Sequence, residues 1–206
     1  MNPKECYNAL LGQKLVDEFK KRNMEGFYFE TRDAAVKKVL DMIPKESLVS
    51  CGGSSTLHEI GIKPALKKGG YNFLDPDDAQ GTLAKDKVAH DALSADYYLM
   101  SSNAITMAGE LVNMDGYGNR TGSLIFGPKN VIVIAGINKV ESDLDSAIKR
   151  AKNEAALKTL LIFKKDYSSF DEVSKAAETA CSQLVITSYS AIKRITVILI
   201  GEILGF

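Results

Sequence analysis

The chain has 206 residues, and its 26 Lys and Arg against 26 Asp and Glu give a formal net charge of zero at pH 7. General nucleic-acid binders and proteins that bind anionic membrane surfaces rely on a surplus of basic residues, so this balance argues against both classes. Hydrophobic residues make up 45% and charged residues 25% of the chain, which is typical of a globular protein and excludes a disordered or fibrous one.

Neither membrane insertion nor export is indicated. The longest strand-like apolar run, residues 195–200, is far shorter than the roughly 20 residues that cross a bilayer. The amino-terminal residues lack the continuous apolar core of a signal peptide. Cys6, Cys51 and Cys181 are widely separated and form no CxxC pair, so we expect neither a disulfide framework nor a zinc site. We therefore expect a cytoplasmic, reduced protein with no cofactor and no metal.

The amino-terminal quarter has helical periodicity. Apolar residues recur every three or four positions from 7 to 19, which predicts an amphipathic helix ending near Gly26. A short strand is expected at 27–29. A second helix begins after the capping residue Thr31 and stops at Pro44.

Apolar segments between turn signals dominate the rest of the chain. The expected strands cover residues 47–51, 71–74, 96–100, 110–114, 131–135, 159–163, 183–187 and 195–200. Several are unbroken apolar runs, which are typical of strands buried on both faces of a parallel sheet. Helical patterns separate most of them, and the pattern that follows Asn138 is long enough for a crossover helix. These features predict an open, mainly parallel, Rossmann-like α/β sheet.

One stretch differs from this pattern. Between residues 103 and 126, short strand-like runs surround Asp115-Gly116, a dipeptide that favours a tight turn. We expect an antiparallel hairpin there. The whole chain is then a single domain, with residues 1–45 as an N-terminal helical extension and residues 46–206 as the α/β core.

A glycine- and hydroxyl-rich loop joins the strand at 47–51 to a helix, with the sequence Gly52-Gly53-Ser54-Ser55-Thr56. The glycines allow a tight turn, and the following amides and hydroxyls suit a phosphate or a carboxylate. No nucleotide-binding P-loop or dinucleotide motif is present. The alternative is a simple strand-to-helix turn, in which Thr56 and Glu59 form a capping box.

Two glutamates are candidate acid–base residues. Glu59 follows the glycine-rich loop, where a carboxylate could act as a general base or be stabilised by the helix dipole alone. Glu110 begins an expected strand, where it could reach a cleft or lie on the surface. Cys51 ends a strand just before the loop, so a helix terminus could lower its pKa, although such cysteines usually only pack.

Several segments in chain order resemble the LUD (lactate utilisation) domain family, which includes the LutC/YkgG-type proteins. They are residues 23–25 (NME), 50–61 (SCGGSSTLHEIG), 103–120 (NAITMAGELVNMDGYGNR), 127–129 (GPK), 133–139 (VIAGINK) and 195–206 (ITVILIGEILGF). The resemblance implies a three-layer sandwich of the ribose-phosphate isomerase and CoA-transferase type, in which a glycine- and serine-rich loop holds substrate phosphate. It also implies a link to the bacterial oxidation of lactate, alongside iron–sulfur proteins.

The chain departs from the family pattern at three places. Met107 and Ala108 stand where acidic residues are usual, Cys51 stands where a Trp is usual, and Cys181 alone remains of a region that is often rich in cysteine. We therefore expect no iron–sulfur cluster or metal contact in this chain on the basis of the resemblance.

Three functions remain open. The first is a binding or accessory subunit that holds a small anion, such as a carboxylate, a sugar phosphate or a CoA compound; its ligand-binding residues would be those of the 52–56 loop with Asn103, Thr106, Asn119 and Arg120. The second is an enzyme of the phosphosugar-isomerase or CoA-transferase type that uses Glu59 or Glu110. The third is a scaffold that binds only other chains. A homo-oligomer or an iron–sulfur protein partner is expected in the first case.

Overall fold

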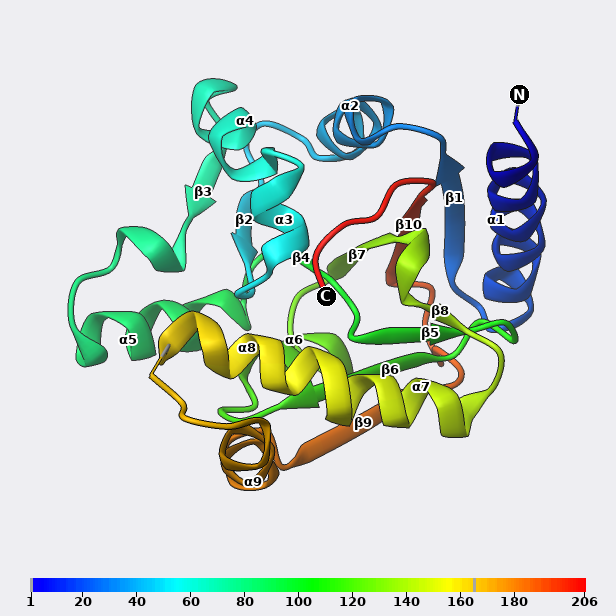
Figure 1. Ribbon diagram of the computed structural model, residues 1–206. Coiled ribbons are helices and arrows are strands. Elements are labelled where there is room, and N and C mark those ends of the chain that lie inside the picture. The colour runs from blue at the N-terminus through cyan, green and yellow to red at the C-terminus, as the bar shows by residue number, and fades with distance from the viewer. Residues whose placement is uncertain (1, 165) are drawn as a thin grey trace.

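A six-stranded parallel sheet forms the centre of the molecule (Figure 1). The computed structural model describes residues 2–164 and 166–206. The strand order is β1-β10-β7-β4-β2-β3, and all five neighbouring pairs are parallel. The sheet is open, with β1 and β3 at its edges. Its strands are β1 (Glu25–Phe29), β2 (Leu48–Cys51), β3 (Asn72–Leu74), β4 (Tyr97–Met100), β7 (Asn130–Gly136) and β10 (Ile195–Ile200).

Two neighbouring inner strands, β7 and β10, are unbroken apolar runs of the sequence. β7 pairs with β10 in a register that places Val133 beside Val197, and both side chains are fully buried. Burying such a side chain contributes roughly 1.5–3 kcal/mol. The sequence prediction of a mainly parallel, open α/β sheet is confirmed.

The amino-terminal segment contributes to this sheet. Asn2 caps α1 (Pro3–Lys21) through a capping box with Glu5, and Thr31 caps α2 (Arg32–Met42) by accepting a hydrogen bond from the amide of Ala34. Between the two helices, β1 pairs with β10. The expected helical extension thus carries an edge strand of the central sheet.

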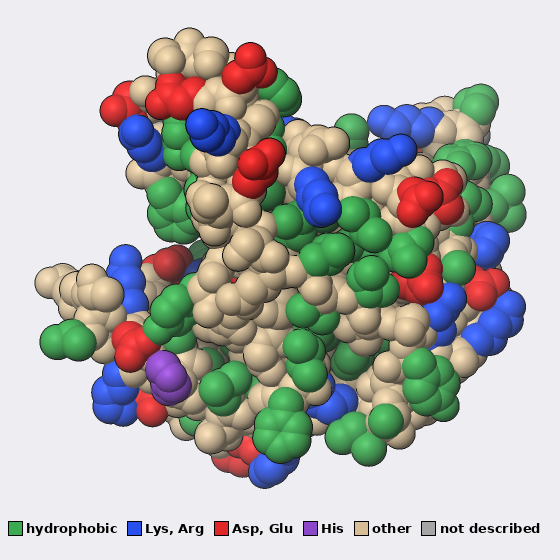
Figure 2. All heavy atoms as spheres, turned by 90° about the horizontal axis from the view of Figure 1, so that it is seen from below, with side chains coloured by type: hydrophobic (Ala, Val, Ile, Leu, Met, Phe, Trp, Pro, Cys, Tyr) green, Lys and Arg blue, Asp and Glu red, His purple; other side chains and the backbone are tan. Residues whose placement is uncertain are grey.

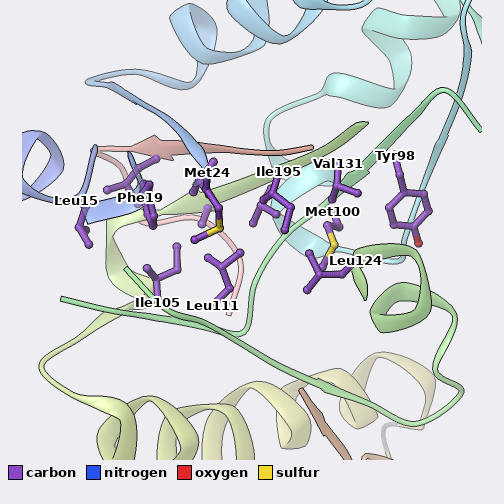
Figure 3. Packing of buried hydrophobic residues seen from close by; sticks show 14 of the residues in the cluster. Leu15, Phe19, Met24, Tyr98, Met100, Ile105, Leu111, Leu124, Val131 and Ile195 are labelled. Atoms are coloured by element: carbon purple, nitrogen blue, oxygen red, sulfur yellow. The ribbon is translucent and has the colours of Figure 1, made fainter. Parts of the chain in front are cut away.

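Both faces of the sheet are covered. α2, α3 (Ser55–Glu59) and α4 (Ile62–Lys68) enclose an apolar cluster on one face. On the other face a second cluster is formed with α1, α6 (Asn119–Ile125) and the hairpin of β5 and β6. Figure 3 shows this second cluster as a continuous row of side chains from Leu15 to Tyr98. A short 3-10 turn, η1 (Pro76–Asp78), and α5 (Thr82–Ala92) connect β3 to β4.

A small second sheet lies below the first, with the order β8-β5-β6-β9. Its strands are β5 (Ala104–Thr106), β6 (Leu111–Asp115), β8 (Val140–Glu141) and β9 (Gln183–Thr187). β5 and β6 are antiparallel, so the expected hairpin exists. Its turn is at 107–110, where Gly109 has φ +87, and not at Asp115-Gly116. The carboxylate of Asp115 instead accepts a hydrogen bond from the amide of Thr121, in the first turn of α6.

The strand expected at 159–163 is wrong. These residues end a continuous helical stretch made of α7 (Leu144–Arg150), a π-helical turn, η3 (Ala151–Ala155), and α8 (Ala156–Phe163). Ala156 and Leu157 pack against Val173 and Ala177 of α9 (Phe170–Ala180). A short apolar run suits a strand or a buried helix equally well, and packing against α9 selects the helix.

No helix in the described residues combines the length and the apolarity needed to cross a membrane. Figure 2 shows one face of the molecule, on which Lys and Arg side chains are intermixed with Asp and Glu. This mixing agrees with the zero net charge of the sequence.

Candidate functional site

A cavity of about 790 Å³ lies beyond the carboxyl ends of β2 and β4. These strands are neighbours in the sheet, but the chain leaves them in opposite directions: β2 is followed by β3 on one side, whereas β4 is followed by β7 on the other. Such a topological switch point is where open α/β sheets bind their ligands. The volume lies within the roughly 300–1,000 Å³ that is usual for small-molecule sites.

Segments far apart in the sequence form the walls. The upper wall consists of the loop after β2, with Gly53 and Ser55, and the loop after β4, with Ser101. The lower wall includes the start of α6 and the side of α8, where Thr159 faces the cavity. α8 runs beneath α3 in Figure 1, and the carboxyl-terminal segment passes between them.

The glycine-rich loop divides into lining and supporting residues. Gly53, Ser54 and Ser55 line the cavity, whereas Gly52 and Thr56 are buried behind it. Ser54 caps α3 by accepting a hydrogen bond from the amide of Leu57 at 3.3 Å. The expected capping box of Thr56 and Glu59 is therefore wrong, because α3 begins one residue before Thr56.

Gly52 is held by close packing. A Cβ at this position would lie 2.8 Å from the hydroxyl oxygen of Tyr98 and 3.2 Å from Cγ of Arg120. A Cβ at Gly53 would meet no atom within 4 Å. The first glycine thus allows the approach of Arg120, and the second keeps the cavity open.

Arg120 ties the wall of the cavity together. Its guanidinium donates to the carbonyl oxygens of Ser101 and Met114 and to the side-chain oxygens of Asn103 and Asn113. Burial lowers the pKa of Arg120 from its usual value. Arg120 and Asn103 both line the cavity, as does Asn119, so three expected ligand-binding residues from outside the glycine-rich loop are brought together with it.

Lys139 is the residue that sequence reasoning missed. It lies in the 3-10 turn η2 (Ile137–Lys139) after β7, lines the cavity, and is only 2% exposed. Its Nζ donates to Thr56 Oγ1 at 3.0 Å and to Ser101 Oγ at 3.1 Å. Within the described residues no carboxylate forms an ion pair with it. The available signal was its position at the end of the 133–139 motif, directly after the most apolar strand.

The electrostatic environment of Lys139 disfavours its charged form. Burial lowers its pKa from 10.5 to about 7, and the positive charges of Arg150 and Arg120 add to this effect. Glu59 and Glu154 act in the opposite direction but do not cancel it. An amine of this kind is partly neutral at physiological pH.

The two candidate glutamates are in different places. Glu59 lines the cavity, and its Oε2 accepts a hydrogen bond from the amide of Gly205 at 2.8 Å. Glu110 and Thr106 lie outside the cavity, at the opposite end of the β5–β6 hairpin. There Thr106 Oγ1 donates to Glu110 Oε2 at 3.0 Å, and the guanidinium of Arg22, the C-cap residue of α1, lies 4.0 Å from Glu110 Oε1. The structure does not bring Glu110 together with the glycine-rich loop, because the hairpin runs away from it.

Two other sequence features have structural roles. Asp75 caps η1 and pairs with Lys63 and Lys67, so the acidic run at 75–78 is neutralised by lysines of α4. Burial raises the pKa of Cys51 to about 12, which is opposite to the lowering considered from its place before a helix. Among residues 2–164 and 166–206, no group of three or more His, Cys, Asp or Glu is arranged to hold a metal ion.

Comparisons with known proteins agree with this architecture. The family model described as "LUD domain" matches residues 12–200. A crystal structure of a DUF162 family protein from Deinococcus radiodurans superposes with a TM-score of 0.58, covering 94% of this chain and 98% of that chain at 11% sequence identity. At this identity the likeness shows the fold alone.

A second structure, eIF2B delta from Chaetomium thermophilum, has a TM-score of 0.38 at 15% identity over 58% of this chain and 54% of its own, which is too low to support an argument. No curated protein matches the sequence. The family match spans the central sheet, both loops of the upper wall and Lys139. The chain therefore belongs to the LUD domain family.

Proposed function

We propose that the protein binds a small anionic compound, either a carboxylate or a phosphate ester, in the cavity at the switch point. The observation that carries the proposal is a pair of cations there, Arg120 and Lys139, that lack an acidic partner among the described residues. Lys139 is buried and Arg120 is partly buried, and within the described residues neither forms an ion pair with a carboxylate.

The energetics favour an anion at this position. A positive charge that is taken out of water without a counter-charge is costly, and a bound anion offsets part of that cost. Three carboxylates also line the cavity, but Asp115 accepts hydrogen bonds from Thr121, Glu59 accepts one from Gly205, and Asp77 pairs with Lys63. The side chains of Ser55 and Ser101 add hydroxyl groups around the same space.

Family membership supports a role related to lactate utilisation. We infer that the chain is a binding or accessory subunit in that context, acting in the cytoplasm and in contact with an iron–sulfur protein. The enzymatic alternative rests on Glu59, the one of the two candidate glutamates that lines the cavity. The position of Glu110 at the far end of the hairpin argues against its part in that alternative.

A thermal-shift titration tests the proposal. Lactate, pyruvate, glycerol 3-phosphate and inorganic phosphate are added to the wild type and to Lys139→Met. A ligand at 100 times its Kd stabilises the native protein by about 2.7 kcal/mol, so at least one of these anions is expected to raise the Tm of the wild type and to act more weakly on the variant.

Lys20→Met is the matched control, because it makes the same chemical change on the exposed face of α1. It should respond as the wild type does. The proposal fails if no anion raises the Tm, or if Lys139→Met responds as strongly as Lys20→Met.

A further inference from the structure

Lys139 has a hydrogen-bond arrangement that fits a neutral amine. Its Nζ donates to two hydroxyl oxygens, Thr56 Oγ1 and Ser101 Oγ. Each hydroxyl in turn donates to a backbone carbonyl: Thr56 to Leu204 at 3.4 Å and Ser101 to Ser102 at 3.5 Å. Because their hydrogens are directed to carbonyls, both hydroxyls act as acceptors toward Lys139.

The hydrogen bonds to Lys139 match the two N–H groups of a neutral amine and leave its lone pair without a partner. A neutral lysine amine has two N–H groups and one lone pair, whereas an ammonium has three N–H donors and no lone pair. The two hydroxyls satisfy two donors, and within the described residues a third acceptor is not found. Lys139 also lines the cavity, which places it next to a bound molecule.

We propose that Lys139 forms a reversible imine with the carbonyl group of a small anionic aldehyde or ketone bound in this cavity. The proposal rests on the proposed anion-binding function and narrows its ligand class to 2-oxoacids and phosphorylated carbonyl compounds.

The surroundings of the amine support this chemistry. Burial and the charges of Arg150 on α7 and Arg120 on α6 lower the pKa of Lys139 to about 7. Glu59 of α3 and Glu154 of the π-helical turn are the acidic groups that influence it from the other elements. Desolvation next to other cations is a known way to activate a lysine as a nucleophile.

The reaction is redox-neutral. The lone pair of Nζ forms a bond to the carbonyl carbon, and the π electrons of the C=O bond move to oxygen, which takes up a proton. Nζ then loses a proton to give a carbinolamine, the hydroxyl takes up a second proton, and the C–O bond breaks so that water leaves while the lone pair of Nζ forms the C=N bond. Loss of the second Nζ proton gives the neutral imine, so two protons leave nitrogen and two are taken up by oxygen. Lysine and carbonyl compound thus give an imine and one water. Glu59, which lines the same cavity and whose charge acts on Lys139, is the carboxyl group that we assign to the exchange of these protons.

Reductive trapping tests the inference on the full chain. Pyruvate or dihydroxyacetone phosphate is added with sodium cyanoborohydride, which converts an imine into a stable secondary amine, and the product is analysed by intact mass and peptide mapping. With pyruvate we expect a single adduct whose mass equals pyruvic acid less one oxygen, located on Lys139. Lys20, which lies exposed on α1, serves as an internal control.

Matched alcohols separate this inference from the binding proposal. Lactate and glycerol 3-phosphate carry the same anionic groups without the carbonyl, so they should bind without being trapped. If both members of a pair bind and pyruvate or dihydroxyacetone phosphate leaves no adduct on Lys139, the imine is refuted while anion binding stands. If no member of either pair binds, the proposed function itself is refuted.

Two further measurements guard against a misfolded variant. Lys139→Met should lose the adduct while its circular dichroism spectrum and cooperative unfolding are retained. For the wild type, the trapping rate should reach half its maximum near the pKa of Lys139, about 7. A rate that keeps rising through pH values near the ordinary lysine pKa of about 10.4 would point to an exposed lysine and overturn the assignment.

Discussion

Of the three cationic side chains that line the cavity, Lys63 is paired with Asp75 and Asp77. Arg120 and Lys139, in contrast, form no ion pair with a described carboxylate and differ in role. The Arg120 guanidinium donates to four acceptors from the loops around it, so it holds the wall in place and keeps its charge. Lys139 is nearly fully buried, is satisfied by two hydroxyls, and has a lowered pKa. Arginine thus supplies a fixed positive charge, and lysine a group that can change its protonation state.

Substitutions of the two glycines of the loop, Gly53 and Gly52, should have different effects on stability and binding. Gly53→Leu should leave the free energy of unfolding within about 0.5 kcal/mol of the wild type, because a Cβ there meets open space. Its side chain would occupy the cavity and lower anion affinity by about tenfold or more, equivalent to roughly 1.4 kcal/mol. Isothermal titration and urea unfolding measure the two effects.

Gly52→Ala, in contrast, should lower the free energy of unfolding. Its Cβ would collide with Tyr98 and Arg120, and overpacking of this kind costs roughly 1–3 kcal/mol. If Gly53→Leu binds anions as tightly as the wild type, the cavity is not the binding site.

The site is built by the ends of three adjacent strands. β2 leads to Gly53 and Ser55, β4 leads to Ser101, and β7 leads to Lys139. Since these strands are neighbours and parallel, their carboxyl ends meet at one edge of the sheet. The hairpin of β5 and β6 places Asn103 at the cavity and Glu110 at its other end. The same hairpin thus brings one expected site residue, Asn103, to the cavity and keeps another, Glu110, away from it.

The hairpin turn allows stability to be separated from binding. Gly109 has φ +87, and a Cβ there would lie 3.1 Å from Cβ of Glu18. Gly109→Ala should therefore cost roughly 1–3 kcal/mol of unfolding free energy, without changing anion affinity, because the turn lies outside the cavity.

Gly122→Ala is the control for this substitution. Gly122 lies inside α6, where the nearest atom to an added Cβ is 3.8 Å away, so alanine should be neutral or stabilising there. Equal stability of the two variants would contradict the role assigned to the turn. Urea unfolding measures both.

At the scale of the whole molecule, the cavity exists because two layers meet. The central sheet supplies the upper wall, and the helical stretch of α7, the π-helical turn and α8 closes the lower side with Thr159 and Leu160. The carboxyl-terminal segment passes between them, where Leu204 O accepts from Thr56 and Gly205 N donates to Glu59. The desolvation of Lys139 depends on all of these parts together.

The buried lysine couples global stability to pH. Its pKa is about 7 in the native protein and about 10.4 when unfolded, so between these values the unfolded state binds more protons. Stability attributable to this group therefore rises with pH through that window, by at most about 1.4 kcal/mol per pH unit, and is lowest below pH 7.

The unfolding free energies of the wild type and Lys139→Met measure this coupling. The difference between the two unfolding free energies is measured by urea unfolding at pH values from about 6 to about 9. It should change in favour of the wild type as the pH rises. Taking the difference removes the contributions of the other titrating groups, including Cys51 and Tyr98, whose pKa values burial raises. A difference that is flat across this range would contradict the burial of Lys139 as a neutral amine.

Several elements were predictable because their causes are local. Unbroken apolar runs at 131–135 and 195–200 indicated strands buried on both faces, and Thr31 indicated the start of a helix. The run at 159–163 misled because its apolar residues are consecutive, and only its packing beside α9 makes it helical. The turn at Asp115-Gly116 was recognised as a turn, but not as one that leads into a helix.

The sequence by itself determined the fold class, the family and the loop at 52–56, because each depends on residue order and on patterns within short segments. Only the tertiary structure decided that Glu59 lines the cavity, that Glu110 does not, and that Lys139 is buried beside Thr56 and Ser101. A lysine is exposed by default, and no local pattern reports its desolvation. That burial results from the meeting of strand ends, the carboxyl-terminal segment and the second layer, which come together only when the chain is folded.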